Sequence, residues 1–570
     1  MLKRIVIDMN CDLVFINGKY LDVETRKFVL GNILIKDGKI CGINKEYICD
    51  NIIDLDGKYI VPGFIDGHIH LESSVISPLE FSKIASLHGT SAVITDPHEI
   101  ANVCGIDGIK YMLQATSNLP ISVYFMVPSC VPATEFDESA YTLDSDAVLE
   151  CFKLDNNRIL GLAEMMNYPG VIYCNTDVLR KIFETHKLGK RVDGHAPGLT
   201  GDDLIKYISA GIESDHECST IEEAREKIDV SRSLNKDFYI MIRQGTAAKN
   251  LEALVDLIND VNYRDNVMFA TDDKHPEELF REGHIDSIIR KAIKLGVKPE
   301  DAYTTASYNA SKYFGLDEFG KIDVNCNADL VILDDINSVN INSVYKNGVL
   351  LDEDSFSNLT NNIDSYLEEK VTNSINMREV LLSDIECSGI NKQVIGLIPG
   401  ELITTNEGIS SDYDLDNDII KAVVIESHKG TMHMGIAYIK GMGLKKGAVG
   451  TTVAHDSHCM ILAGTNDLDI VVAANNLAKM QGGKIYVENG NVLESLALPI
   501  ANLMTNENPK VVIEKMERLK ELAVVNDGID VFMNLSFVSL PVIGDVRLLP
   551  SGAFDVKNWK MITQEELNER

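Results

Sequence analysis

Eight short apolar runs alternate with segments of helical period between Val61 and about Gly320. This alternation constrains the fold more than any other feature of the sequence. The runs are GFIDGHIH, SAVITDPHE, ISVYFMVPS, ILGLAEMM, RVDGHAPG, GIESDHE, FYIMIRQG and VMFATDDKH. Such runs, followed by segments like PLEFSKIASLHG, are typical of βα units around a parallel sheet. Eight units over roughly 250 residues match a closed (β/α)8 TIM-type barrel. We therefore predict an α/β fold with a barrel over residues 61–320. A doubly wound sheet could also hold eight strands, but its site would gather at a single crevice.

Segments rich in β-branched residues flank this region on both sides. Residues 1–60 contain runs such as NILIKDGKI, and residues 321–355 contain ADLVILD and VYKNGVLL. We expect the two flanks to pair into one small β-sheet domain. The polar, acidic stretch DEDSFSNLTNNIDSYLEEK is typical of a linker. Beyond it, residues 376–570 indicate a C-terminal α+β domain.

The charge balance limits the classes of partner. Lys and Arg total 53 against 86 Asp and Glu, which gives a net charge of −33. Such a surface repels phosphate backbones and anionic lipids, so we expect a small-molecule substrate, no nucleic acid and no membrane. The chain has no signal-peptide run or membrane-spanning stretch, and its 11 Cys include no CxxC pair. These features predict a soluble cytoplasmic protein with reduced thiols.

Metal-ligating side chains recur at the ends of the predicted strands. His68 and His70 end the first run, and because strand side chains alternate, both project to one side and can bind one ion. The ends of the fourth, fifth, sixth and eighth runs carry Glu164, His195, His216 and Asp272. In a barrel these ends converge on one face. Imidazoles and carboxylates suit zinc, iron or manganese, and a carboxylate can bridge two ions. Each residue alone also fits a structural role, such as a turn for His195 or a helix N-cap for Asp272. Together the six predict a binuclear metal site.

The same motifs carry a family resemblance. VPGFIDGHIHLE with GLAEMM, DGHAPG, SDHE and ATDDKH resembles the amidohydrolase superfamily. TDPHEIANV and HKGTMHMGIAYIKGMG resemble the bacterial adenine deaminase family within it, and the resemblance covers essentially the whole chain. It implies purine salvage by hydrolysis of adenine to hypoxanthine and ammonia, with two divalent ions, Mn²⁺ or Fe²⁺. It assigns one ion to His68, His70 and Asp272, the other to His195 and His216, and the bridge to Glu164, where many relatives have a carboxylated lysine.

The resemblance also implies roles in catalysis. A metal-bridging hydroxide would attack C6 of adenine, and Asp272 would take the released proton and pass it to the departing amino group. Attack on the ring also needs an acid that protonates a ring nitrogen, and the candidates are His98, Glu99 and Glu72. Glu72 and Glu99 could instead cap the helices that follow them. Asp96 and Asp273 are expected to orient ligating imidazoles.

The C-terminal region adds two weaker motifs. GMGLKKGAVG lacks the spacing of a P-loop and indicates a mobile or tightly turning loop. His455 and His458, in HDSH, have a metal-binding spacing, but a pair without nearby acids supporting it is more often structural. We expect this segment to cover the barrel mouth or to form the interface of a homo-oligomer, bringing His455 or His458 near the substrate.

Two alternative functions stay open. The first is an N-acetyl-sugar (amino-sugar phosphate) deacetylase of the same superfamily, which also has Glu on a middle strand. The second is a catalytically silent barrel scaffold. The presence of all six ligand-type residues argues against the scaffold.

Overall fold

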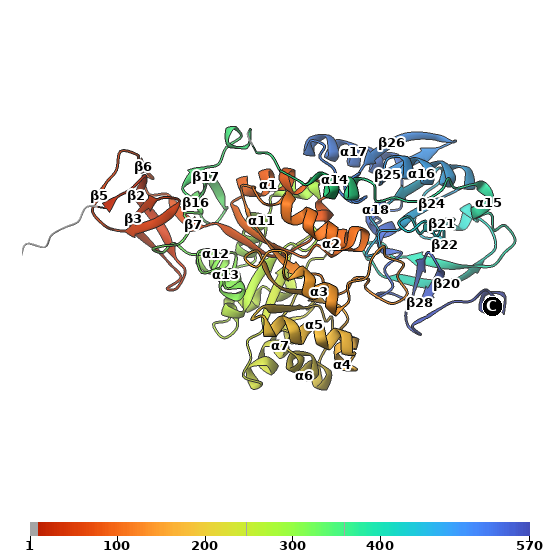
Figure 1. The fold of residues 1–570 in the computed structure, drawn as a ribbon, viewed down its shortest axis with the longest axis horizontal. Helices are drawn as coiled ribbons and strands as arrows, with labels where there is room; N and C mark the ends of the chain where they lie inside the picture. Colours follow the sequence, from red (N-terminus) through yellow and green to blue (C-terminus); the bar gives the residue numbers. More distant parts are fainter. Residues whose placement is uncertain (1–8, 247, 358, 570) are drawn as a thin grey trace, which may run out of the picture.

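The computed structural model describes residues 9–246, 248–357 and 359–569. Three regions follow one another along the long axis of the molecule (Figure 1). A small sheet from the N-terminal part of the chain lies at one end, helices and parallel strands lie in the middle, and the C-terminal part lies at the other end. Within the described part of the chain, no helix has both the length and the apolar character needed to cross a membrane.

The middle region, here called the parallel-strand unit, contains eight parallel strands. Within each sheet, neighbouring strands follow one another in chain order. One sheet of five and one of three contain them. The first sheet comprises β8 (Phe64–Ile69), β9 (Thr90–Thr95), β10 (Ser122–Val127), β11 (Ile159–Met165) and β12 (Arg191–Gly194), and the second comprises β13 (Ser214–Asp215), β14 (Tyr239–Arg243) and β15 (Val267–Ala270). Each of the eight predicted runs therefore contains a strand.

Backbone hydrogen bonds connect the two sheets at both junctions. The Glu213 N–H group donates to the Val192 carbonyl at 2.9 Å, which joins β12 to the segment before β13. At the other junction, the Asp272 N–H group donates to the His68 carbonyl at 2.9 Å, and the His70 N–H group donates to the Asp272 carbonyl at 3.1 Å. The carboxyl ends of the first and eighth strands consequently lie side by side.

The helices of this unit pack one apolar face on the strands. In α11 (Ile285–Lys294), the buried residues Ile285, Ile288, Ile289 and Ala292 recur every three or four positions. This spacing places them on one face of the helix. Burying an isoleucine side chain contributes roughly 1.5–3 kcal/mol, so these faces hold the helices on the sheets and fix the strand ends.

The small sheet draws strands from both flanks of the parallel-strand unit. Its order is β18-β17-β16-β7-β2-β3-β4, with β6 paired to β2. Antiparallel pairing of β16 with β7 connects the two flanks. Its strands are β2 (Leu13–Asp22), β3 (Lys27–Lys36), β4 (Lys39–Ile43), β6 (Ile52–Asp54), β7 (Tyr59–Pro62), β16 (Leu330–Asp335), β17 (Asn340–Lys346) and β18 (Val349–Leu350).

The stretch expected to be a linker contains helical structure. It includes the 3-10 turn Asp354–Phe356 and the start of α14 (Ser365–Thr372). Leu367 and Val371 lie one helical turn apart and are buried, and the Asp364 N–H group donates to the Gln114 side chain of α2 (His98–Ala115). Two apolar residues at helical spacing are enough to dock this turn. The polar residues around them made the segment resemble a linker in the sequence.

The C-terminal region, here called the C-terminal unit (residues 376–569), is built on an eight-stranded sheet. Its order is β20-β19-β22-β21-β24-β23-β25-β26, and a three-stranded sheet β27-β28-β29 accompanies it. The strands are β19 (Lys392–Leu397), β20 (Thr404–Ser410), β21 (Ile419–Ile425), β22 (Met434–Lys440), β23 (Ala448–Thr451), β24 (Met460–Gly464), β25 (Gly483–Glu488), β26 (Asn491–Ala497), β27 (Val546–Leu549), β28 (Gly552–Asp555) and β29 (Lys560–Met561). The longer helices are α16 (Asp467–Lys479) and α17 (Pro509–Leu522), and the shorter α18 (Val531–Phe537) lies near the parallel-strand unit.

The Gly-rich motif GMGLKKGAVG forms the tight connection from β22 to β23. Gly441, Gly443 and Gly447 have φ of 93°, 85° and 78°, a region that favours glycine. The carboxylate of Asp418 accepts the Gly443 N–H group at 2.8 Å. The motif is therefore a tight turn, and the HDSH segment that follows β23 is the part that reaches the parallel-strand unit.

Candidate metal centre and adjoining pocket

The six predicted ligands lie together at the carboxyl ends of the parallel strands. His68 lies within β8 and Glu164 within β11. His70, His195 and His216 directly follow β8, β12 and β13, respectively. Asp272 lies two residues after the end of β15. All have buried or half-buried side chains. The strand-end placement expected from the sequence is thus present.

The junction of β8 with β15 positions two of these groups. Glycine at position 67 leaves room for a close approach, because a Cβ there would lie 3.0 Å from the Met268 sulfur and 3.1 Å from the Phe269 carbonyl oxygen. The buried Asp66 carboxylate accepts the Thr271 N–H group at 3.0 Å and its hydroxyl at 2.5 Å. These bonds hold the segment after β15, and therefore Asp272, against the end of β8.

The two carboxylate oxygens of Glu164 face two different pairs of histidines. Oε2 lies 2.7 Å from Nδ1 of His195 and 3.1 Å from Nε2 of His216. Oε1 lies 3.4 Å from Nε2 of His70 and 3.9 Å from Nε2 of His68. A carboxylate placed between two sets of donors has the arrangement of a bridging ligand.

Asp272 completes the set on the Oε1 side. Its Oδ1 lies 3.2 Å from Nε2 of His70 and 3.7 Å from Nε2 of His68. Metal–nitrogen and metal–oxygen bonds are about 2.0–2.2 Å, so ligands of one ion lie roughly 3 Å apart. Nε2 of His68 is buried and has no hydrogen-bond partner among the described residues. The donor types, their spacing and this unpartnered nitrogen all fit divalent metal ions.

The electrostatics of the site favour positive charge at its centre. Burial raises the pKa of Glu164, but hydrogen bonds from His195, His216 and His70 outweigh it and hold the pKa well below the usual range. Burial likewise raises the pKa of Asp272. The charge of Arg243 and the contacts with His68 and His70 outweigh burial, so the pKa lies well below its usual range. Both carboxylates are therefore ionised, and bound cations would neutralise them.

Arg243 and Glu217 belong to the site and were missed by the sequence analysis. Nη1 of Arg243 lies 2.5 Å from Oδ2 of Asp272 and 2.6 Å from Oε1 of Glu217. Oε1 of Glu217 lies 3.5 Å from Nδ1 of His195. Arg243 ends the seventh predicted strand and Glu217 follows His216, so the strand-end rule that selected the other residues could have found both.

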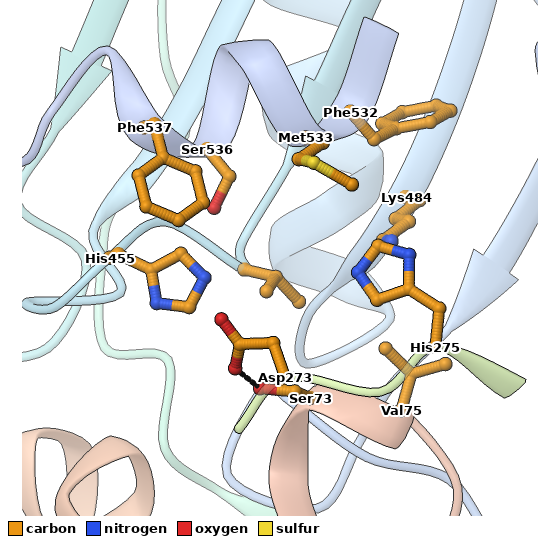
Figure 2. Close-up of a pocket in the computed structure, with 11 residues that line it drawn as sticks. Ser73, Val75, Asp273, His275, His455, Lys484, Phe532, Met533, Ser536 and Phe537 are labelled. Atoms are coloured by element: carbon orange, nitrogen blue, oxygen red, sulfur yellow. Dashed lines mark hydrogen bonds between the residues drawn. The ribbon is translucent and has the colours of Figure 1, made fainter. Parts of the chain in front are cut away.

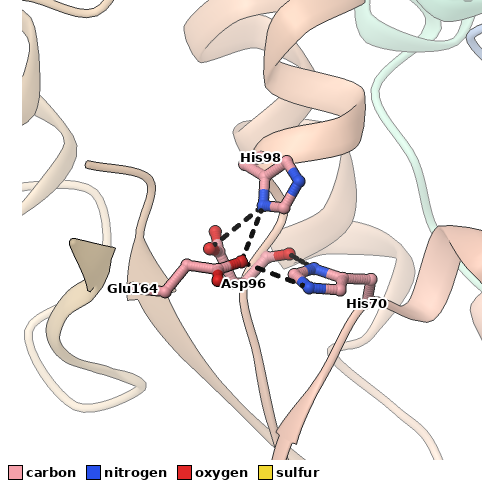
Figure 3. A group of neighbouring side chains, drawn as sticks. All are labelled: His70, Asp96, His98 and Glu164. Carbon is pink, nitrogen blue, oxygen red and sulfur yellow. Dashed lines mark hydrogen bonds and ion pairs between the residues drawn. The ribbon is translucent and has the colours of Figure 1, made fainter. Parts of the chain in front are cut away.

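His98 lies directly beside the six residues. Its Nδ1 lies 3.5 Å from Oε1 of Glu164 and 3.2 Å from Oδ2 of Asp96 (Figure 3). The carbonyl of Asp96 lies 3.0 Å from Nδ1 of His70. Asp96 thus contacts a predicted ligand through its backbone, while its carboxylate contacts His98.

Glu72 and Glu99 lie further out, in different environments. Oε1 of Glu72 accepts the Ile100 N–H group at 3.2 Å in the first turn of α2, and burial raises the pKa of Glu72 to about 7. Glu99 instead contacts two histidines of the C-terminal unit, with its Oε1 2.8 Å from Nδ1 of His455 and its Oε2 against Nε2 of His458. The expectation that no acid supports this histidine pair was therefore wrong, because the acid comes from another part of the chain.

A pocket opens next to this cluster, between the parallel-strand unit and the C-terminal unit. Figure 2 shows Asp273 and Ser73 on one side and His455, Ser536 and Phe537 on the other. The remaining lining residues are Val75, His275, Val453, Lys484, Phe532 and Met533. Asp273 accepts the Ser73 hydroxyl and lines the pocket, so it does not orient a ligating imidazole as expected. Aromatic walls with a few polar groups suit a small planar molecule.

Comparison with known proteins places the chain in a family. Residues 59–351 match the amidohydrolase family, and residues 401–560 match the adenine deaminase C-terminal domain. The chain is 40% identical over 566 residues to an adenine deaminase of Clostridium acetobutylicum, covering 96% of this chain and 97% of that protein. It is 39% identical to one of Desulfatibacillum aliphaticivorans, covering 98% and 97%, and 38% identical to one of Dehalococcoides mccartyi, with the same coverage. The chain therefore belongs to the adenine deaminase family of the amidohydrolase superfamily.

Proposed function

We propose that this protein is an adenine deaminase of purine salvage, which hydrolyses adenine to hypoxanthine and ammonia. The observation that carries the proposal is the Glu164 carboxylate between two histidine pairs. It lies in a chain that matches adenine deaminases over nearly its whole length. Catalysis of this hydrolysis needs an activated water and a proton carrier beside it, and the site has residues for both.

The residues that would hold two divalent ions, Mn²⁺ or Fe²⁺, follow from the two sides of Glu164. His68, His70 and Asp272 would bind one ion, His195 and His216 the other, and Glu164 both. Bound metal lowers the pKa of water from about 16 to roughly 7, which supplies a nucleophile at neutral pH. The Asp96 carbonyl lies 3.0 Å from Nδ1 of His70 and would orient this imidazole toward the ion.

Asp272 is the proposed proton carrier. Arg243 contacts its Oδ2, while Oδ1 faces the histidines. The carboxylate can take a proton from the attacking water and deliver it to the departing amino group. His98, Glu99 and Glu72 are the groups proposed to supply or hold the proton for the ring. Among them, His98 lies beside Glu164 and Glu99 lies near the pocket.

The proposal includes an organisation into three domains. Residues 61–320 would form the metal-binding (β/α)8 barrel, residues 1–60 and 321–355 the small β-sheet domain, and residues 376–570 the C-terminal domain. Support for a closed barrel comes from the hydrogen bonds that join β8 to the segment after β15. In this arrangement the C-terminal domain contributes one wall of the pocket.

The test of the proposed function is a comparison of substrates. We expect the protein loaded with Mn²⁺ or Fe²⁺ to remove adenine absorbance and release ammonia in equal amounts, and to release no acetate from N-acetylated amino-sugar phosphates. Removal of the metal with a chelator should abolish adenine turnover, and adding metal back should restore it. Acetate release without adenine turnover would establish the deacetylase instead. A metal-loaded protein that acts on neither substrate would favour a scaffold.

A further inference from the structure

The carboxylate of Glu99 contacts two histidines of the C-terminal unit. Nδ1 of His455 lies 2.8 Å from Oε1 of Glu99, and Nε2 of His458 contacts Oε2. The exposed fraction of the Glu99 side chain is 3%, and that of His458 is 0%. Both carboxylate oxygens therefore face histidines, and Glu99 has little exposed surface to present to a substrate.

His455 is the member of this trio that reaches the pocket. Its side chain is 12% exposed, it lines the pocket, and its ring packs on Phe537 with the centroids 4.6 Å apart. With Nδ1 turned to Glu99, Nε2 forms no hydrogen bond with any residue in the described part of the chain. Figure 2 shows the imidazole across the pocket from Asp273. A free imidazole nitrogen thus faces the pocket.

The pocket lies close to the proposed metal centre on two sides. Asp273, on one wall, directly follows Asp272 in the chain. On the other, Oε1 of Glu99 lies 3.4 Å from Nε2 of His98, whose Nδ1 lies 3.5 Å from Glu164. One imidazole therefore separates the His455–Glu99 pair from the predicted bridging carboxylate.

We propose that Nε2 of His455 donates the proton that a ring nitrogen of the purine needs during attack, and that Glu99 positions the imidazole. The inference rests on the proposed deaminase function. It transfers the acid role from His98, Glu99 and Glu72 to a residue of the C-terminal unit. It also gives this unit a chemical role, because the parallel-strand unit alone lacks this imidazole.

Ionisation of a water molecule gives hydroxide and one proton, which His455 holds. The hydroxide oxygen bonds to C6, the electron pair of the C6–N1 double bond moves to N1, and N1 takes the proton from Nε2 of His455. Asp272 then carries the remaining hydroxyl proton to the amino group, the C6–N6 bond breaks, and the C6 carbonyl forms as ammonia leaves. Ionisation of the next water returns one proton to His455. The sum is adenine plus water giving hypoxanthine plus ammonia.

The charges around His455 keep it in the donating form. Burial lowers its pKa, but Glu99 from α2, Asp273 from the segment after β15 and Asp456 from its own loop together raise the pKa to about 9. The other titratable groups around it are His458 and His98, which share Glu99, and His275 and Lys484, which line the same pocket. Since an imidazole is charged below its pKa, His455 carries a proton at neutral pH and loses it as pH rises through about 9.

The test compares His455→Ala with a matched histidine of the same unit. His433 also reaches the parallel-strand unit, with Nδ1 2.7 Å from Oε2 of Glu138, but it is 60% exposed and absent from the pocket lining. We expect His455→Ala to lower kcat/KM for adenine by about 10²–10³-fold, the range of a lost general acid, and His433→Ala to leave it unchanged. His455→Gln, which retains a hydrogen-bonding side chain beside Glu99, should be as slow as the alanine variant.

Three further readouts distinguish proton donation from a structural role. Metal content of His455→Ala should equal that of the wild type, added imidazole should partly restore its rate, and the fall of wild-type kcat/KM above pH of about 9 should be missing from the variant. A His455→Gln rate within threefold of wild type, or loss of metal from either variant, would overturn the inference. Absence of adenine turnover in the wild type would instead overturn the proposed function, and the inference with it.

Discussion

Replacing Glu164 by alanine is expected to remove metal and adenine turnover together. Each carboxylate oxygen faces one histidine pair, so no other residue can take over both contacts. Without this negative charge, four imidazoles would have to bind two cations, and Asp272 would be the one carboxylate left among the six predicted ligands. We expect the metal content to fall from about two equivalents to about one or fewer. Elemental analysis of the purified variant measures it, and the adenine assay should give no rate above background.

The matched control for this variant is Glu213→Ala. Glu213 pairs with Arg191 at 2.7 Å, at the opposite ends of the same parallel strands. The Glu213→Ala variant loses a carboxylate from the parallel-strand unit but leaves the metal site untouched. We expect this variant to retain its metal and most of its activity. Circular dichroism should show both variants folded, because the strands and their helices keep their apolar contacts. Two full equivalents of metal in Glu164→Ala would mean that the bridging ligand is misassigned.

The strand positions could be predicted because local pattern determines them. A run such as SAVITDPHE combines β-branched residues with an abrupt change to polar residues, and the polar end is where β9 stops. The ligand-type residues could be found for the same reason, since each one lies in the last two residues of a strand or just after it. Local pattern did not reveal α14, where two apolar residues, Leu367 and Val371, dock a turn of otherwise polar sequence.

The contacts between distant parts of the chain could not be predicted in this way. His455 and His458 appeared to lack an acid because their partner, Glu99, starts α2 in another unit. Neither HDSH nor TDPHE contains a pattern that predicts contact between the two segments. The contact depends on how the C-terminal unit docks on the parallel-strand unit. Arg243 differs, because its place at the end of β14 was visible, and only its ion pairs with Asp272 and Glu217 required the structure.

Asp272→Asn should give a large loss of kcat and leave the fold unchanged. Asp272 has φ of 60°, in the left-handed region that asparagine adopts more readily than most residues. Its backbone hydrogen bonds to His68 and His70 do not involve the side chain and should persist. The amide retains one oxygen near the histidines but is a poor proton acceptor. We therefore expect kcat to fall by roughly 10³–10⁴-fold, from the combined loss of base and ligand, with a much smaller change in KM.

Steady-state kinetics at fixed metal loading measure this effect, and Asp265→Asn is its control. Asp265 lies just before β15, at the opposite end from Asp272, and its carboxylate pairs with Arg26 at 2.5 Å. The same chemical change there should leave kcat unaltered. Metal content separates the two roles of Asp272: a slow variant that retains both ions has lost the proton carrier, whereas one that has lost an ion has lost a ligand. Turnover within tenfold of wild type would exclude Asp272 as the proton carrier, and Glu217 beside Arg243 would then be the next carboxylate to test.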